Sequence, residues 1–253
     1  MNETTTEKMR RMKFYGMLRE FKSNLESTAS SALTADEVVS NLIDAEWDDR
    51  HNRSIQRSLH NARFRYKANM EQIEYSPDRT LDRNLILRLA EGNYIRKKEN
   101  ILITGSTGLG KSYIASALGN QACTQGYKVM YFNTAKLFSK LKMAKADGTY
   151  ISEMARIERQ DLLIIDDFGI SPIDSQGRAY LLEIIEDRHG KKSMIITSQL
   201  PVSRWYDVIG EQTIADAILD RIVHEAHRIE IEGESMRRKK QETDIAPVNE
   251  ILT

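Results

Sequence analysis

A short glycine-rich segment near the middle of the chain has residue types that bind phosphate groups. Gly105 and Gly110 bracket four residues and are followed by Lys111 and Ser112, which is the P-loop pattern. Glycines let backbone N–H groups turn toward phosphates without a Cβ in the way. The lysine would reach the β- and γ-phosphates, and the serine hydroxyl would ligate magnesium. The residues expected to contact the nucleotide are Gly105, Ser106, Thr107, Gly108, Leu109, Gly110, Lys111, Ser112 and Tyr113.

Two adjacent carboxylates, Asp166 and Asp167, follow four aliphatic residues at positions 162–165. A P-loop requires an acid at the end of another strand, and ligands of such sheets bind where the strands end. We expect Asp166 to hold the metal, usually through water. Asp167 is placed to orient or deprotonate the attacking water. An Asp-Asp pair also occurs in surface turns, but rarely straight after four buried aliphatic residues.

A further polar group follows the next apolar run, where residues 196–199 read Ile-Thr-Ser-Gln. A side chain here would lie between the P-loop and Asp166, within reach of the γ-phosphate or the water, and Gln199 is the candidate. The alternative is ordinary strand-end turn chemistry, because Pro201 lies just beyond.

The elements that must position these groups are visible as short apolar runs separated by helical stretches. Continuous apolar runs of this kind indicate a mostly parallel sheet covered on both faces, hence an α/β domain of five strands. The helix that opens near Lys111 should end around Gln125, with Gly126 as its C-terminal cap. The expected strands are Ile101–Thr104, Val129–Phe132, Leu162–Ile165, Met194–Thr197 and Arg228–Ile231.

Residues 1 to about 75 have a different pattern and are predicted to be helical throughout. One amphipathic helix passes through Phe14 and Leu25, and Thr34 with Glu37 forms a possible capping box for a second. A third runs from about residue 55 to 66. Pro77 then marks a turn and a domain edge. The predicted parts are a helical N-terminal domain at 1–75, a linker at 76–99, a nucleotide-binding core at 100–233 and a short C-terminal segment at 234–253.

Composition sets outer limits on the class of protein. The 253 residues include 37 basic and 37 acidic side chains, so net charge says nothing about partners. The single cysteine, Cys123, cannot form an internal disulfide, and no Cys/His cluster has zinc spacing. Because no signal-peptide core or membrane-spanning apolar run is visible, we expect a soluble cytoplasmic protein.

Taken together, the P-loop, the Asp166-Asp167 pair and the polar strand end resemble the AAA+ ATPases of the helicase-loader clade. More closely, the chain resembles the IstB-type transposition helper ATPases of bacterial insertion sequences, over nearly its whole length. The N-terminal motifs discriminate best, because many families share the P-loop core. The segments that carry the resemblance are 44–47 (Asp-Ala-Glu-Trp), 62–65 (Ala-Arg-Phe-Arg), Asn100 and 233–238 (Gly-Glu-Ser-Met-Arg-Arg).

The resemblance implies an ATP- and magnesium-dependent AAA+ core that assembles into rings or helical arrays. Arg221 then looks like an arginine finger that reaches a neighbour's nucleotide, and Arg237 like a sensor arginine for the subunit's own nucleotide. An arginine finger contributes about 10³-fold or more to phosphoryl transfer; the alternative for both residues is a surface salt bridge. The family pattern more often has Glu at Asp167 and Asn at Gln199. These two departures, and a C-terminal segment too short for a full helical lid, favour a slow timer over a fast motor.

DNA contacts are expected in the stretch from Arg50 to Met70, which contains no acidic residue. Part of it forms one helical face, and phosphates would be bound without reading the base sequence. A basic face is often only solvated, so the DNA-handling resemblance supports this assignment. A weaker candidate is the helix carrying Lys136, Lys140 and Lys145. The expected DNA-binding residues are Arg50, Arg53, Arg57, Arg63, Arg65 and Lys67.

The leading hypothesis is an ATP-dependent protein that oligomerises on double-stranded DNA and assists a transposase. A replicative-helicase loader is the alternative from the same superfamily. A nucleotide-gated DNA clamp that barely hydrolyses ATP is the alternative from another class. A small-molecule kinase would need an acceptor pocket and an arginine-bearing lid, for which the remaining chain offers no obvious segment.

Overall fold

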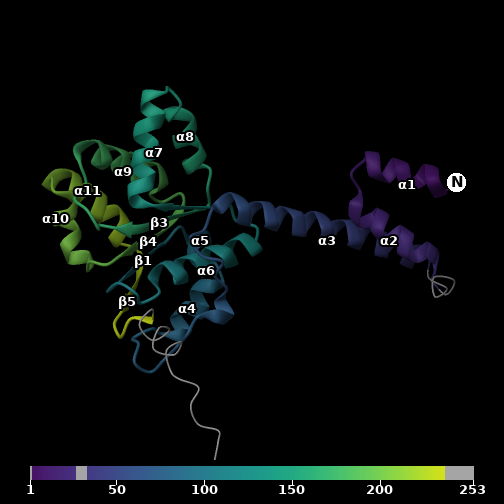
Figure 1. The fold of residues 1–253 in the computed structure, drawn as a ribbon, viewed down its shortest axis with the longest axis horizontal. Helices are drawn as coiled ribbons and strands as arrows, with labels where there is room; N and C mark the ends of the chain where they lie inside the picture. The colour runs from purple at the N-terminus through teal and green to yellow at the C-terminus, as the bar shows by residue number, and fades with distance from the viewer. Residues whose placement is uncertain (1, 27–32, 237–253) are drawn as a thin grey trace, which may run out of the picture. The chain divides into compact units, whose positions relative to one another are not determined.

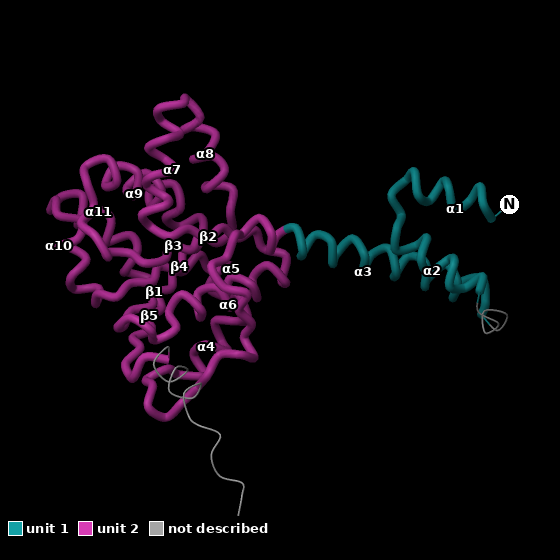
Figure 2. Tube along the Cα trace, viewed as in Figure 1, with its two compact units in different colours: residues 1–57 teal, residues 58–253 magenta. Residues whose placement is uncertain are grey.

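The computed structural model describes residues 2–26 and 33–236. The chain divides into two compact units, residues 1–57 and residues 58–253 (Figure 2). The division comes before the edge expected at Pro77, because Ala62, Ala68 and Ile73 are buried in the same apolar cluster as the sheet of the second unit.

The first unit is helical, as expected. It comprises α1 (Asn2–Arg11), α2 (Tyr15–Glu26) and most of α3 (Ala35–Ala62). The capping box is confirmed, because the Thr34 amide donates to Glu37 Oε2 over 2.7 Å and the Glu37 amide donates to Thr34 Oγ1 over 3.3 Å. Helix α2 approaches α3 closely at Gly16, where a Cβ would lie 2.2 Å from the Ala45 carbonyl oxygen. This contact requires glycine.

Helix α3 is one continuous helix where two were expected, and it ends earlier than predicted. Arg63 adopts a left-handed backbone with φ +57°, which stops the helix. The chain then runs without helix to the short 3₁₀ turn η2 (Met70–Gln72). Packing explains the correction: a Cβ at Gly119 would lie 2.6 Å from the Phe64 ring, and Asn120 Nδ2 donates to the Ala68 carbonyl over 2.9 Å. Tertiary contacts therefore override the helical pattern of residues 63–66.

The second unit contains a five-stranded, fully parallel sheet in the order β2-β3-β4-β1-β5. All five expected strands are present, extended by one to three residues, so the predicted α/β class is confirmed. The strands are β1 (Asn100–Gly105), β2 (Val129–Asn133), β3 (Leu162–Phe168), β4 (Ser193–Ser198) and β5 (Ala226–Ile231).

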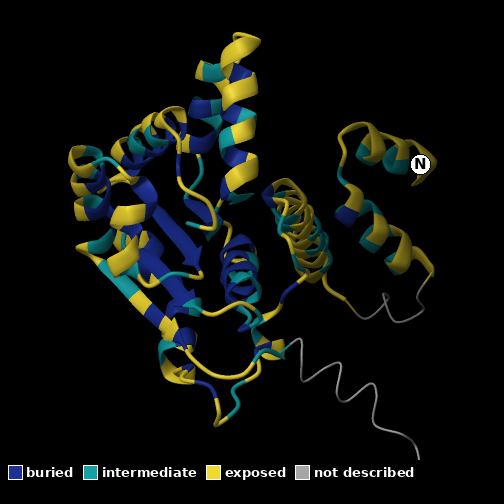
Figure 3. Ribbon diagram, turned by 60° about the vertical axis from the view of Figure 1, so that its left-hand side comes forward, coloured by how far each residue is buried: buried dark blue, intermediate teal, exposed yellow. Residues whose placement is uncertain are grey.

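Helices cover both faces of this sheet (Figure 1). Alternating strand residues such as Ile164 and Ile165 enter opposite apolar clusters, as the pleat requires. The strands β1, β3 and β4 are buried over almost their whole length (Figure 3). One face packs against α4 (Arg83–Ala90), α5 (Asn93–Lys97) and α6 (Lys111–Thr124). The other packs against α7 (Thr134–Ala146), α8 (Tyr150–Glu158), α9 (Ser175–Arg188), α10 (Trp205–Ile209) and α11 (Gln212–Val223).

Because the strands are parallel, the carboxyl ends of β1, β3 and β4 lie side by side at one end of the sheet. There β1 runs into α6 through residues 106–110, and β3 ends at the acid pair. Among the described residues, no helix has the length and apolar character needed to cross a membrane.

Candidate nucleotide-binding site

The P-loop connects β1 to α6 and has the backbone that glycine permits. Gly108 and Gly110 have φ values of +83° and +79°, in the left-handed region. A Cβ at Gly105 would lie 2.1 Å from the Ile231 carbonyl oxygen. Lys111 opens α6 and is only 6% exposed, with its Nζ donating to the Ser106 carbonyl over 2.7 Å. The ammonium group therefore lies inside the loop, where the helix N-terminus adds positive potential for anions.

Asp166 lies fully buried at the end of β3 and accepts hydrogen bonds from three hydroxyl groups. Ser112 Oγ donates to Asp166 Oδ1 over 2.7 Å. The hydroxyls of Thr197 on β4 and Tyr131 on β2 donate to Oδ1 and Oδ2 respectively. Burial of Tyr131, followed by its bond to Asp166, raises the pKa of its hydroxyl, which keeps it a donor. These donors offset the cost of burying a carboxylate.

A serine hydroxyl and a carboxylate facing each other are hard oxygen ligands of the kind that magnesium prefers. Ser112 and Asp166 therefore fit the predicted magnesium site. A metal held by these two residues, at the start of α6 and near the end of β3, would lie beside a triphosphate bound by the P-loop. No cluster of three or more His, Cys, Asp or Glu that could hold a metal ion occurs in the described part of the chain.

Asp167 lies within a bulge in the pairing of β3 with β4 and has a left-handed backbone, with φ +59°. Its amide donates to Thr197 Oγ1 over 3.1 Å. Its Oδ2 accepts from Asn133 Nδ2 over 3.0 Å and from Arg65 Nη1 over 2.9 Å. Aspartate tolerates this backbone better than most residues do. The side chain of Asp167 lines a cavity at this end of the sheet.

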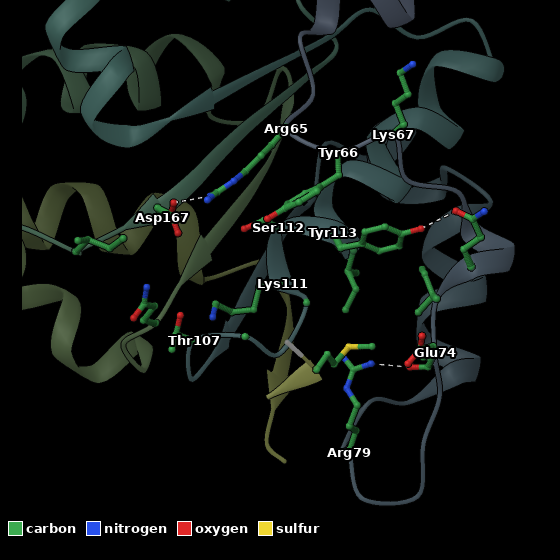
Figure 4. Close-up of a pocket in the computed structure, with 18 residues that line it drawn as sticks. Arg65, Tyr66, Lys67, Glu74, Arg79, Thr107, Lys111, Ser112, Tyr113 and Asp167 are labelled. Carbon is green, nitrogen blue, oxygen red and sulfur yellow. Dashed lines mark hydrogen bonds and ion pairs between the residues drawn. The ribbon is translucent and has the colours of Figure 1, made fainter. Parts of the chain in front are cut away.

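The groups surround a cavity of about 690 Å³. Figure 4 shows Arg65 pointing at Asp167, with Ser112 nearby and Lys111 and Thr107 on the P-loop side of the cavity. The far wall is aromatic. Its residues Tyr66 and Tyr113 have ring centroids 6.2 Å apart. One end of the cavity thus offers cations and acids to a triphosphate, and the other offers ring faces to a flat base.

Comparison with known proteins places the chain in a family. The family model described as IstB-like ATP-binding protein matches residues 7–244. The chain belongs to the IstB-like ATP-binding protein family. An insertion-sequence ATP-binding protein of Sinorhizobium fredii is 42% identical over 237 residues, which cover 94% of this chain and 97% of that protein. The insertion sequence IS21 ATP-binding protein of Pseudomonas aeruginosa is 28% identical over 231 residues, covering 91% and 87%.

Solved structures show that this IstB-like chain has the P-loop AAA+ fold. DnaI aligns with a TM-score of 0.58 at 21% identity, covering 70% of this chain and 94% of that one. The DnaC helicase loader aligns with a TM-score of 0.54 at 17% identity, covering 66% and 98%. The replication initiator DnaA, bound to AMPPCP and single-stranded DNA, aligns with a TM-score of 0.57 at 19% identity, covering 74% and 58%.

Of the other residues expected at the IstB-like site, Gln199 lines the cavity as an exposed side chain just after β4. The β4 hydroxyl that contacts both acids, however, belongs to Thr197. Arg221 lies on α11, where Nη1 donates to the Ala217 carbonyl over 2.6 Å and Nη2 lies 3.7 Å from Glu186 Oε1. It does not line its own subunit's cavity. Arg237 lies outside the described residues.

The first three residues expected to bind DNA lie on α3 in the first unit. Arg50 Nε lies 2.6 Å from Glu46 Oε1, and Arg53 Nε lies 2.7 Å from Asp49 Oδ2. The acid-free stretch is therefore partly neutralised by acids one turn before it. Arg57 forms no ion pair with any residue that the structure describes.

The remaining three residues expected to contact DNA lie in the second unit, and one of them, Arg65, contacts the acid pair at the end of β3. Arg65 lies at the acid pair, 2.9 Å from Asp167 and 3.3 Å from Asp166. Lys67 lines the outer part of the same cavity and points away from the P-loop (Figure 4). Arg63 is exposed at the end of α3. The extended segment after α3 thus brings part of the basic stretch to the nucleotide site of this IstB-like protein.

Several site residues were not predicted from the sequence. Arg79 is 9% exposed and joins the cavity wall to the P-loop, donating to the Leu109 and Glu74 carbonyls, each over 2.6 Å. Asn133 ends β2 beside Asp166 in the sheet register. A polar residue at the end of a neighbouring strand is a signal that could have identified Asn133. Nothing local marks Arg79 or Tyr66.

Removal of the Thr197 hydroxyl should weaken both the fold and magnesium binding. Thr197→Val keeps the shape but takes a donor from the buried Asp166 and an acceptor from the Asp167 amide, so we expect a loss of about 1–3 kcal/mol. Urea unfolding measures this loss. Ser198→Ala is the matched control, because its buried hydroxyl bonds the Phe168 carbonyl and not an acid. Only Thr197→Val should raise the magnesium concentration needed for nucleotide binding; an equal shift in both variants would contradict this role.

Proposed function

We propose that this protein binds Mg-ATP in the cavity, hydrolyses it slowly, and uses the nucleotide to control its assembly on double-stranded DNA as the helper of a transposase. The observation that carries the proposal is the contact of Ser112 with the buried Asp166 beside Lys111. It combines a cation for phosphates, two magnesium ligands and a neighbouring acid in one cavity.

Each residue has a chemical task in this proposal. Lys111 and the loop amides bind the β- and γ-phosphates, while Ser112 and Asp166 orient the metal, whose charge stabilises the phosphoryl oxygens. Asp167 positions the attacking water and accepts its proton. Gln199 lines the cavity and contacts the γ-phosphate in this proposal. The tyrosine rings at 66 and 113 enclose the base.

Assembly and DNA binding rest on the family and on the positions of the remaining cations. The relatives are named as insertion-sequence proteins, which supports a transposase as partner. The partly exposed side chain of Arg221 on α11, outside the cavity of its own chain, supports a role as an arginine finger. Arg237 remains the proposed sensor arginine. Arg50, Arg53 and Arg57 supply phosphate contacts on the first unit.

One observation favours a second candidate, the nucleotide-gated DNA clamp. The carboxylate of Asp167, which should activate water, is bound by Arg65 and Asn133. With this carboxylate oxygen occupied by two donors, it is not available to the attacking water, so turnover in the isolated subunit should be low. The two candidates differ in whether DNA or a partner raises the rate of phosphate release.

Three experiments test the proposal. Isothermal calorimetry with Mg-ATP should give saturable binding; no heat and no saturation would end it. Electron microscopy of the protein with duplex DNA and a slowly hydrolysed ATP analogue should show oligomers on DNA that are lost without nucleotide. Pull-down with the transposase of the same insertion sequence, against a replicative helicase, separates the helper from a helicase loader.

A further inference from the structure

A second cavity of about 630 Å³ lies beside the edge strand β2, between the segment that follows α3 and the helices α7 and α8. It lies entirely within the second unit. Its polar lining is dominated by cations. The charged residues that line it are Arg63, Arg65, Lys136, Lys140, Arg156 and Asp167.

The positive charge of this cavity is not balanced by nearby acids. Lys140 and Arg156 share one carboxylate, Glu153, and Arg65 is paired with the acids at the end of β3. Arg63 and Lys136 form no ion pair with any residue in the described ranges 2–26 and 33–236. Five cations face three carboxylates, which leaves an excess of two positive charges at one cavity.

The chemistry that suits this lining is a chain of phosphodiesters. Cations spread over a cavity of this size match successive phosphates better than one small anion. Lysine and arginine contacts to phosphates also require no base sequence. Phe132, half-buried in the same wall, offers an aromatic surface beside the cations. An acidic peptide would also pair with these cations. DNA is the better candidate because the proposed function requires DNA binding and does not require an acidic peptide.

Arg65 and Asp167 line both cavities. The Arg65 guanidinium therefore has the two β3 acids on one side and the phosphate-binding lining on the other. Its side chain is 42% exposed, so solvent and an incoming phosphate can reach the guanidinium. A phosphate in the second cavity competes with Asp167 for this guanidinium, because both are anions within reach of one cation.

We infer that the second cavity binds the phosphodiester backbone of DNA, and that Arg65 couples this binding to ATP turnover by releasing Asp167. Arg65 acts as a positioning residue: while it donates to Asp167 Oδ2, that oxygen is occupied by two donors. When DNA draws Arg65 away, the oxygen keeps only the bond from Asn133 and can accept the proton of water. The inference rests on the proposed function and adds the contact through which DNA would stimulate hydrolysis.

The DNA-binding part is tested on the full chain by fluorescence anisotropy with a labelled duplex over a range of salt concentrations. Lys136→Ala and Arg63→Asn each remove one cation; asparagine is chosen because it tolerates the left-handed backbone of Arg63. Each variant should lower the slope of log affinity against log salt by about 0.9. Lys142→Ala is the matched control, an exposed lysine of α7 that does not line the cavity, and should keep the wild-type slope.

The coupling is tested by phosphate release at saturating ATP with and without duplex DNA. Arg65→Ala should raise the DNA-free rate and leave little further stimulation, whereas Lys136→Ala should reduce the stimulation by DNA. Thermal unfolding of each variant checks that the fold is kept. A lower DNA-free rate in Arg65→Ala with unchanged stimulation would overturn the coupling.

The outcomes separate this inference from the proposed function. If the wild-type protein binds no DNA, the proposed function fails. If it binds DNA and Lys136→Ala and Arg63→Asn keep its affinity and salt slope, only the second cavity is excluded. Binding of polyglutamate through Lys136 and Arg63 without competition from DNA would also overturn the inference, and would assign the cavity to an acidic protein partner.

Discussion

Lys111→Ala is expected to weaken Mg-ATP binding by about 100-fold or more, which corresponds to roughly 2.7 kcal/mol. Lys111 is the buried ammonium of the P-loop, held by the Ser106 carbonyl at the start of α6. Alanine removes the charge that the β- and γ-phosphates require, and the loop amides alone do not replace it. Calorimetry with Mg-ATP measures the affinity, and light scattering on DNA measures the assembly that should be lost with it.

The control for this variant is Lys142→Ala, which removes an equal charge from the exposed side of α7. It should bind nucleotide as the wild type does. If Lys111→Ala lost ATP affinity but still formed full-size complexes on DNA, the nucleotide would not control assembly.

Asp167→Asn should separate nucleotide binding from hydrolysis. Asparagine tolerates the left-handed backbone at this position and keeps an oxygen that accepts from Arg65, but it cannot take a proton from water. Loss of a general base costs about 10²–10⁴-fold in rate. We therefore expect phosphate release stimulated by DNA or partner to fall by that factor, while the affinity for Mg-ATP changes by less than about fivefold.

Asp167→Ala is a useful second variant, because alanine removes the carboxylate and fits the left-handed backbone less well. Urea unfolding should therefore show that it is less stable than Asp167→Asn. Equal, near-zero rates of phosphate release for the wild type and Asp167→Asn, with DNA present, would leave the clamp as the function of this protein.

The sequence predicts the fold and the centre of the site well because their signals are local. The P-loop is contiguous, and the acid pair directly follows four buried aliphatic residues of β3. The five apolar runs become five strands because a parallel sheet covered on both faces requires continuous apolar segments. In each case the residues that form the element and the residues that the element positions are contiguous in the sequence.

The remainder of the site depends on contacts between distant segments. Tyr131 and Thr197 reach Asp166 because β2 and β4 flank β3 in the sheet, and strand order is not written in any one stretch. Arg65 was expected to contact DNA, in a helix predicted to continue to about residue 66. The turn at Arg63 and the packing of Phe64 against α6 instead bring the guanidinium to the acids.

The three hydroxyls on Asp166 come from α6, β2 and β4, so this carboxylate has its full set of partners only when all four elements are assembled. A nascent or partly opened chain, lacking any one of them, would have a damaged metal site and bind Mg-ATP poorly. The ligand would then select completed sheets: at 100 times its dissociation constant it would stabilise them by about 2.7 kcal/mol over unfolded chains. Cellular ATP would in this way protect the finished protein from proteases, while leaving immature copies exposed.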